Sequence, residues 1–300
     1  MSALDAVFRQ DVLNAPARTR VDPLARVAPE VVLPSDVEIK SGAYLPAGVE
    51  LASGCRIGPN VAFVEGAPII VKRGVHIGAN ATILPGVTLA AHCVVRPGAV
   101  VARSVPPGAI VEGNPAAITG YVDTQAGPAG VLHAPAAPSR SRTEALAPRG
   151  VTLHHFPVIP DLRGHLTVGE FGREIPFTPR RWFMVFGVPS REVRGEHAHH
   201  TCHQFLLCLR GSCAVVADDG RQRVEVLLDA PQRGLYLPPM TWGIQYKYSA
   251  DAMLMVFASH HYDAADYIRE YDEFLATVQA APPAAPQVAP QAMPQAVQQP

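Results

Sequence analysis

The sequence predicts an all-β protein of two domains, a parallel β-helix followed by a β-sandwich or closed β-barrel. The β-helix is predicted by apolar residues that recur every six positions from residue 31 onward. The second domain is predicted by short apolar runs between residues 151 and 278 that turn residues separate. A stretch rich in Ala, Pro, Gly and Ser lies between them. We therefore expect domains at residues 27–123 and 150–279, joined by a linker at 124–149.

The six-residue period is carried by small or β-branched residues, each followed two positions later by another apolar residue. Each hexad of such a repeat supplies one short strand and a turn, and stacked coils share one core because a single coil cannot bury its own apolar face. Gly and Pro fall where the chain must turn, as at Pro85-Gly86. The period slips by two residues once, before Val75. The inward positions are Val31, Val37, Ala43, Val49, Cys55, Val61, Val75, Ala81, Val87, Cys93, Ala99 and Val105.

The segments outside the two domains lack apolar periodicity. The linker and a Pro- and Ala-rich tail at residues 280–300 cannot bury enough apolar area to offset the entropy of ordering, so open chain is expected for both. Residues 1 to about 25 are poorly patterned. A short helix at residues 5–14 and a loose arm are both open interpretations there.

The sequence of the second domain predicts regularly spaced strands. Apolar runs such as RWFMVFGV, QFLLCLRGS and AMLMVFAS are separated by turn signals such as Asp218-Asp219-Gly220, a pattern typical of a sandwich or barrel. The last segment, DAADYIREYDEFLATV, predicts a helix over residues 263–278. The face of this helix would carry Tyr267, Ile268, Tyr271, Phe274 and Leu275.

The stretch RGEHAHHTCHQFLLCLRG, residues 194–211, is where we expect the chemistry. His197 and His199 are two positions apart, so in a strand both imidazoles lie on one face. An imidazole with a pKa near 6.5 can both take and give a proton at neutral pH. The alternative is that both are structural histidines with satisfied hydrogen bonds.

Composition excludes several classes of function. A formal net charge of −1 and a pI near 6.9 argue against a nucleic-acid-binding platform. No apolar run is long enough to span a membrane, and the N-terminus lacks the pattern of a secretory signal. Five cysteines without a CxxC pair indicate reduced thiols, so we expect a cytoplasmic protein without membrane or nucleic-acid partners.

An HxH strand followed by a glycine turn is also the cupin signature. Metal-binding cupins need a carboxylate a few residues after HxH, where this chain has His203 and Gln204, and a histidine in a second motif. The matching region, GLYLPPMTWGIQ, contains none. We expect no metal site, although two or three imidazoles could still hold an ion.

The first domain resembles the hexapeptide-repeat acyltransferases. IGANATILPGV and SVPPGAIVEGNPAAITGYV carry the likeness, which is closest to sugar N-acetyltransferases. The resemblance implies a left-handed β-helix, a trimer, and acetyl-CoA as a cosubstrate beside Asn114, Pro115 and Ala116. The polar loop that usually shapes the amine pocket is absent after Phe63, and only His76 and His92 could act as a base in the repeat. A trimeric scaffold without chemistry is the alternative.

The second domain resembles the sugar 3,4-ketoisomerases that act on dTDP-4-keto-6-deoxyglucose. DLRGHL, IPFTPRRWFMVF, RGEHAH, QFLLCLRGS, GLYLPPMTW and DYIREYDEF occur in the family's order. These enzymes are cupins that use no metal or other cofactor, and bifunctional relatives join them to a hexapeptide acetyltransferase. The resemblance implies His199 as the base at C3 and His197 as its partner. Substrate binding is assigned to Arg163, Arg181, Arg194, Gln204 and Trp242.

Two departures from the family pattern affect the expected activity. The family usually has tyrosines in the strand written here Trp182-Phe183-Met184, and often a histidine where this chain has Gly243. Our first hypothesis is a bifunctional nucleotide-sugar enzyme in which a cupin isomerase is joined to a trimeric acetyltransferase, with possible further contacts between cupin domains. The alternatives are a non-catalytic sugar-nucleotide-binding cupin on the scaffold and a metal-dependent epimerase or oxygenase.

Overall fold

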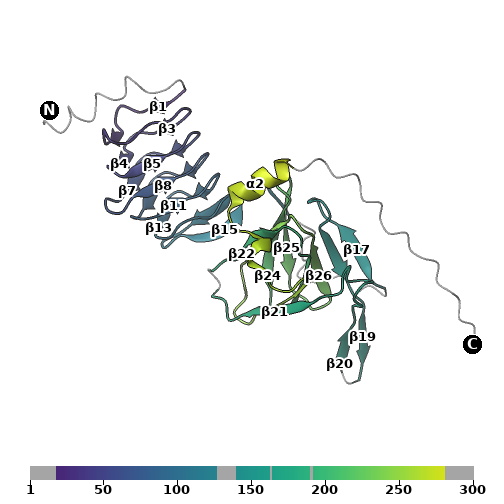
Figure 1. Ribbon diagram of the computed structural model, residues 1–300. Helices are drawn as coiled ribbons and strands as arrows, with labels where there is room; N and C mark the ends of the chain where they lie inside the picture. The colour runs from purple at the N-terminus through teal and green to yellow at the C-terminus, as the bar shows by residue number, and fades with distance from the viewer. Residues whose placement is uncertain (1–17, 127–139, 163, 190–191, 281–300) are drawn as a thin grey trace, which may run out of the picture.

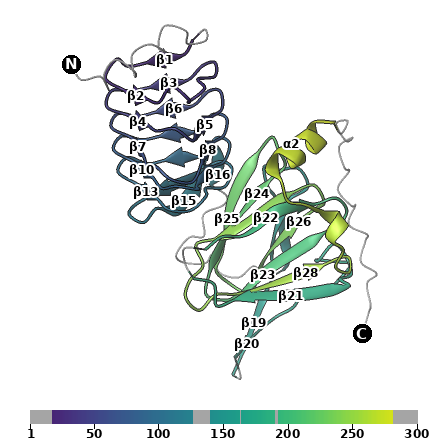
Figure 2. The ribbon, with the colours of Figure 1, turned by 60° about the vertical axis from the view of Figure 1, so that its left-hand side comes forward.

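The computed structural model describes residues 18–126, 140–162, 164–189 and 192–280. Its N-terminal domain is a stack of coils built from three sheets of very short strands (Figures 1 and 2). One sheet contains β1 (Arg20–Val21), β3 (Glu38–Ile39), β6 (Arg56–Ile57), β9 (His76–Ile77), β12 (Val94–Val95), β14 (Ala109–Glu112) and β15 (Ala117–Tyr121). Another contains β2 (Arg26–Val27), β4 (Tyr44–Leu45), β7 (Ala62–Phe63), β10 (Thr82–Ile83) and β13 (Val100–Val101). The third contains β5 (Val49–Leu51), β8 (Ile69–Val71) and β11 (Thr88–Leu89).

The predicted period of six is the repeat of this stack. Glu38 pairs with Arg56, 18 residues further along, which corresponds to three hexads in each coil. Arg56 pairs with His76, 20 residues further along, so the predicted slip of two residues is confirmed. All of the predicted inward positions are buried. The core therefore forms because each coil stacks its apolar side chains on those of the next coil.

The second domain is a sandwich of two six-stranded antiparallel sheets, with a parallel edge strand contributed by β16. The β22 sheet contains β16 (Thr124–Ala126), β25 (Arg223–Leu228), β24 (Cys213–Asp218), β27 (Trp242–Tyr246), β22 (Arg194–His199) and β29 (Tyr267–Ile268). The β23 sheet contains β17 (Arg142–Ala145), β18 (Thr152–His155), β26 (Arg233–Leu237), β23 (Gln204–Arg210), β28 (Met253–Ala258) and β21 (Arg181–Phe186). Residues such as Leu206, Val215 and Val226 form the core of the sandwich. A separate hairpin, β19 (Val158–Asp161) and β20 (Gly164–Thr167), projects away from it (Figure 1).

The predicted linker at residues 124–149 is too long. Thr124–Ala126 pairs with β25, and Arg142–Ala145 pairs with β18, so both ends of the segment belong to the sandwich. Polar residues satisfy ladder hydrogen bonds through their backbone, which composition does not reveal. Residues 127–139, the proposed helix at 5–14 and the tail after Ala280 lie outside the described residues.

The predicted C-terminal helix at residues 263–278 is wrong in its first half. A 3-10 turn, η2 (Ala264–Asp266), is followed by strand β29, and the helix α2 covers only Tyr271–Ala280. Tyr267 and Ile268 pair with His199 and Ala198 of β22. The segment is therefore held in an extended form by tertiary pairing that overrides its helical pattern.

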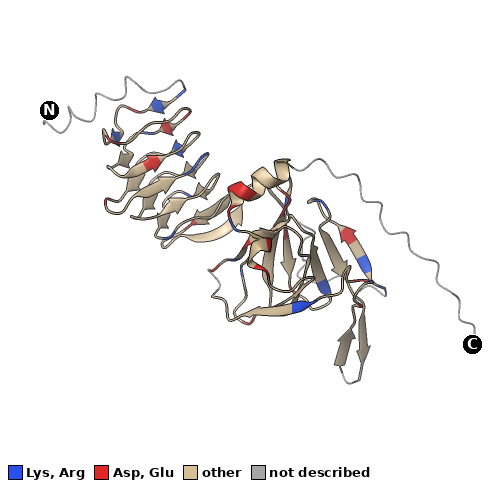
Figure 3. Ribbon diagram, in the orientation of Figure 1, with Lys and Arg blue, Asp and Glu red and all other residues tan. Residues whose placement is uncertain are grey.

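The distribution of charged and apolar residues in the structure agrees with the composition of the sequence. Basic and acidic residues are interspersed along both domains (Figure 3), as expected from the formal net charge of −1. Within the described residues, no helix is long and apolar enough to cross a membrane.

Candidate active site

Strand β22 brings the two predicted histidines together. The ring centroids of His197 and His199 are 5.0 Å apart, and the rings are nearly perpendicular. Ala198 between them is buried on the opposite face of the strand. The Tyr267 ring of β29 lies 4.9 Å from the ring of His197 and 4.3 Å from that of His199. A phenol thus forms one wall of the imidazole pair.

A β-bulge sets the orientation of His197. The pairing of β22 with β27 shifts between Gly195 and His197, and Glu196 adopts a left-handed φ of 53°. A side chain on Gly195 would place its Cβ 2.5 Å from the carbonyl oxygen of Gly243, so this glycine is required by close backbone approach. Bulges of this kind re-aim side chains next to active sites.

His199 has both ring nitrogens engaged. Its Nδ1 lies 2.9 Å from Asp266 Oδ2, and because a carboxylate only accepts, Nδ1 carries the proton and donates. Its Nε2 accepts from the amide of Gln204 at 3.1 Å. The residue is 5% exposed. Burial, with the nearby charge of His197, lowers the pKa of His199 to about 4 despite the opposing effect of Asp266.

Asp266 is fixed by its own hydrogen bonds. It accepts from the backbone N–H and hydroxyl of Thr201, each at 2.7 Å, and from the backbone N–H of Cys202 at 3.2 Å. Burial opposes ionisation, but the bonds from Thr201 and His199 lower the pKa of Asp266 overall. Asp266 is therefore an ionised anchor that holds the imidazole of His199 in one orientation.

His197 has a different environment. Its Nδ1 donates to the carbonyl oxygen of Gly195 at 2.9 Å, which leaves the lone pair on Nε2. Among the described residues, this Nε2 has no hydrogen-bond partner. Burial, followed by the positive charge of Arg269, lowers the pKa of His197. At neutral pH the residue is an uncharged imidazole with one basic nitrogen free.

Arg181 of β21 lies close to this pair. Its charge contributes to the lowered pKa of His199, and its guanidinium carbon lies 5.5 Å from the ring centroids of both Phe183 and Tyr262. The Nε atom is buried and has no partner within the described part of the chain. A cation held by aromatic rings with an unused donor suits an anionic group.

Comparison with known proteins assigns the domain that carries this site to a family. Residues 149–279 match the family described as FdtA, WxcM-like, C-terminal. TDP-4-oxo-6-deoxy-alpha-D-glucose-3,4-oxoisomerase from Aneurinibacillus thermoaerophilus is 44% identical over 120 residues, covering 40% of this chain and 86% of that protein. The chain belongs to this FdtA-like family. The resemblance predicted from the cupin motifs is thereby confirmed.

Two solved structures are similar to part of this chain, and a second family model matches residues of the β-helix. A 3,4-ketoisomerase from Helicobacter canadensis is 35% identical, with a TM-score of 0.42, over 43% of this chain and 98% of that one. A double mutant of the QdtA 3,4-ketoisomerase from Thermoanaerobacterium thermosaccharolyticum, in complex with TDP, is 35% identical, with a TM-score of 0.43. The match covers 44% of this chain and 95% of that one. Residues 68–103 match the bacterial transferase hexapeptide family (six repeats).

Two of the predicted substrate residues do not join the imidazoles in the FdtA-like domain. Trp242 is 3% exposed and packs against Tyr271 and Phe274 of α2, so the prediction that it stacks on a substrate ring is wrong. Strand alternation turns Trp242 toward the helix and Gly243 toward His197. Arg194 is exposed at the start of β22, where its charge acts on Tyr248. Arg163 lies outside the described residues.

The FdtA-like domain adds residues that sequence reasoning missed. Asp266 and Tyr267 both belong to the quoted motif DYIREYDEF, but their assignment to a helix concealed that Tyr267 pairs with His199. His199, Cys202 and Asp266 also place ligand atoms within 4.8 Å of one another. Asp266 and the Nδ1 of His199 are, however, committed to hydrogen bonds with each other and with the backbone. The absence of a metal remains a prediction.

The predicted acetyl-CoA residues lie in the turn between β14 and β15. Pro115 and Ala116 line a cavity of about 460 Å³ that also includes residues of the FdtA-like domain, whereas Asn114 is exposed and is not part of this lining. His76 and His92 are both exposed on the coils, as expected for surface histidines. A role in acetyl transfer remains a prediction.

Proposed function

We propose that the FdtA-like domain converts a dTDP-4-keto-6-deoxyhexose, such as dTDP-4-keto-6-deoxyglucose, into the corresponding 3-keto sugar. The observation that carries the proposal is an imidazole, His197, with a free Nε2, in a domain that is 44% identical over 120 residues to a named 3,4-oxoisomerase. A neutral base beside a second, anchored imidazole suits proton transfer between adjacent carbons.

The proposed reaction moves hydrogen without net oxidation. His197 Nε2 takes the proton from C3, and the electrons of the broken C–H bond form the C3–C4 double bond of an enediolate while the C4 carbonyl oxygen becomes negative. The hydroxyl on C3 loses its proton and becomes the new carbonyl, a proton is delivered to C4, and the oxygen on C4 is protonated. One bond to hydrogen is lost at C3 and one is gained at C4.

This assignment changes the expected roles of the two histidines. His199 was expected to be the C3 base, but its Nε2 accepts from Gln204 and its Nδ1 donates to Asp266. We assign His199 a positioning role, as an anchored imidazole beside His197. Tyr267, against both rings, is the phenol proposed to return the proton that Phe183 and Met184 of β21 cannot supply. Arg181 is proposed to bind the substrate diphosphate.

The β-helix domain supports a second proposal. Its match to the bacterial transferase hexapeptide family favours an acetyl-CoA-dependent sugar N-acetyltransferase that assembles as a trimer. Release of thiol from acetyl-CoA, measured with a dTDP-3-amino-6-deoxyhexose as acceptor, tests the activity. If no thiol is released by a folded trimer, the domain is the non-catalytic scaffold.

The isomerase proposal is tested by following the substrate directly. Substrate labelled with carbon-13 in the hexose is incubated with the full chain, and the carbonyl position is read by NMR. A new 3-keto signal is the expected result. Binding of the substrate without any new carbonyl signal would instead favour a non-catalytic sugar-nucleotide-binding domain.

A further inference from the structure

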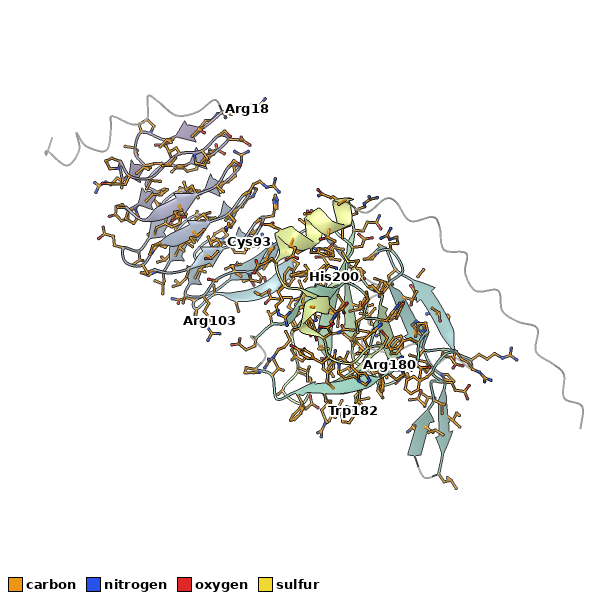
Figure 4. All side chains as sticks on the ribbon, viewed as in Figure 1. Arg18, Cys93, Arg103, Arg180, Trp182 and His200 are labelled. Atoms are coloured by element: carbon orange, nitrogen blue, oxygen red, sulfur yellow. The ribbon has the colours of Figure 1, made fainter. Side chains whose placement is uncertain are left out.

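A cavity of about 460 Å³ lies where the last coils of the β-helix meet the FdtA-like domain. Val105 and Val111 of the coils, with Ile118 of β15, form its apolar wall, and Val193 closes it from the other domain. The exposed residue Arg103 marks the end of the stack that faces this junction (Figure 4). The cavity is distinct from the imidazole pair because neither His197 nor His199 lines it, although Glu196 lies next to His197 in the bulge of β22.

Glu196 provides the main polar group of this cavity. It lies in the bulge of β22, next to His197, and its Oε1 is buried without a hydrogen-bond partner among the described residues. Its left-handed φ of 53° is a backbone conformation that residues other than glycine adopt only at an energetic cost. The fold thus keeps a strained residue in place with one carboxylate oxygen unpaired among the described residues. Strain of this kind clusters at ligand sites.

Within the described part of the chain, no ion pair neutralises the carboxylate of Glu196. Arg103 is engaged by Glu192 at the rim, with its Nη1 2.7 Å from Oε1 of Glu192. The Tyr121 hydroxyl is also buried and unpartnered, and after burial the charge of Glu196 is the next cause that raises the pKa of Tyr121. An unpaired carboxylate taken out of water is costly unless a cation or a proton compensates it. Burial accordingly raises the pKa of Glu196.

We propose that this junction cavity is a second ligand site, for a small molecule that carries a primary ammonium group on a compact, mostly apolar body. The ammonium would donate to Glu196, and the apolar body would contact Val105, Val111 and Ile118. The unpaired carboxylate oxygen of Glu196 disfavours an anionic ligand. Because the ligand contacts both domains, it binds only to the intact chain.

The test uses cyclohexylamine, which is protonated at pH 8, and cyclohexanol as a neutral analogue of similar shape. Binding of each to the full chain is measured by calorimetry for the wild type, Glu196→Gln and the control Glu112→Gln, which removes an exposed carboxylate of β14. We expect at least tenfold tighter binding of the ammonium in the wild type and in Glu112→Gln. Glu196→Gln should lose that preference and retain cyclohexanol binding.

A second variant separates loss of the site from loss of the fold. Ile118→Trp fills the cavity from β15 and should abolish binding of both probes, with the thermal transition retained. The proposal is overturned if the wild type binds neither probe, if it binds both equally, or if Glu196→Gln still prefers the ammonium. Binding that survives in a folded Ile118→Trp also overturns it, because the probe then lies elsewhere.

Discussion

His197 and His199 lie two positions apart on β22 but have different hydrogen-bond partners. One donates to a carbonyl oxygen of its own bulge and keeps a free nitrogen, while the other is held between Asp266 and Gln204. This difference is the basis of the separate roles that we propose for the two imidazoles. It also leads to three predictions at the scale of single residues.

Asp266→Asn removes the negative charge that holds His199. We expect kcat of the proposed isomerisation to fall by about 10- to 100-fold, because a small misplacement of a catalytic group reduces the rate by a factor of that order, while KM changes little. Steady-state kinetics separate the two parameters. The control is Asp263→Asn, which alters only the cap of η2. An equal loss of activity in both variants would contradict a specific positioning role.

Tyr267→Phe keeps the ring against both imidazoles and removes only the hydroxyl. We expect kcat to fall by about 100-fold, the lower end of what a positioned acid or base contributes, with substrate affinity retained. Tyr262→Phe, which changes a neighbouring ring 5.7 Å away, serves as the control. Full activity of Tyr267→Phe would assign the returning proton to another group.

The pH dependence follows from the lowered pKa of His197. A base works in its neutral form, and burial holds the pKa of this imidazole below 6.5, so it stays neutral to a lower pH than a free histidine. The acid limb of the kcat/KM profile should therefore have its midpoint below pH 6.5. A midpoint above this value in the wild type would show that the base is not this histidine.

At this scale, the sequence predicts features that depend on local spacing better than features that depend on contacts between distant residues. The imidazole pair follows from a period of two, which needs no knowledge of the fold. Asp266 was missed because it is 67 positions away from His199 and reaches it only through the pairing of β29. Trp242 was misplaced because the sequence does not say which face of β27 the helix α2 covers.

Among the elements, the β-helix was predicted in detail and the C-terminal segment was not. The hexads specify both the strands and the packing, since each coil contacts only its neighbours. Strand β16 pairs with β25, 99 residues further along the chain, whereas β17 pairs with the neighbouring β18, and both strands have a composition that resembles a linker. The helical pattern after Asp263 was correct only for Tyr271–Ala280, where no sheet pairing competes.

Stacking of the coils predicts a requirement for glycine at position 78. A Cβ there would lie 2.6 Å from the backbone nitrogen of Pro97 in the next coil, so Gly78→Ala should destabilise the β-helix by about 1–3 kcal/mol. Gly120→Ala is the matched control, because its nearest neighbour, Ile110 Cδ1, is 3.9 Å away. Thermal unfolding measures both. Equal unfolding temperatures of the two variants would mean that the coils accommodate a Cβ at position 78 without loss of stability.

For the whole molecule, the described contacts make the two domains one packed unit. Tyr121 of the last coil meets Tyr246 edge to face at 5.4 Å, and β16 continues directly into the β22 sheet. Arg223 donates to Asp218, to the hydroxyl of Tyr271 and to the carbonyl oxygen of Val122. One guanidinium thus connects the sandwich, α2 and the end of the β-helix.

Removal of the Arg223 guanidinium should lower the free energy of unfolding. Arg223→Met leaves the buried carboxylate of Asp218 without its cation, and breaking such a pair typically costs about 3–5 kcal/mol. The exposed Arg221→Met provides the control. Chemical denaturation of the full chain gives the free energy of unfolding. If both variants unfold like the wild type, the network does not join the domains energetically.

The most direct measurement is the entry of solvent hydrogen into the sugar ring. The full chain is incubated with dTDP-4-keto-6-deoxyglucose in deuterium oxide, and the ring is followed by NMR and mass spectrometry. The wild type should incorporate deuterium, His199→Asn should do so more slowly, and His197→Asn should not do so at all while still binding the nucleotide sugar. Undiminished exchange in His197→Asn, or none in the folded wild type, would contradict proton transfer by this imidazole.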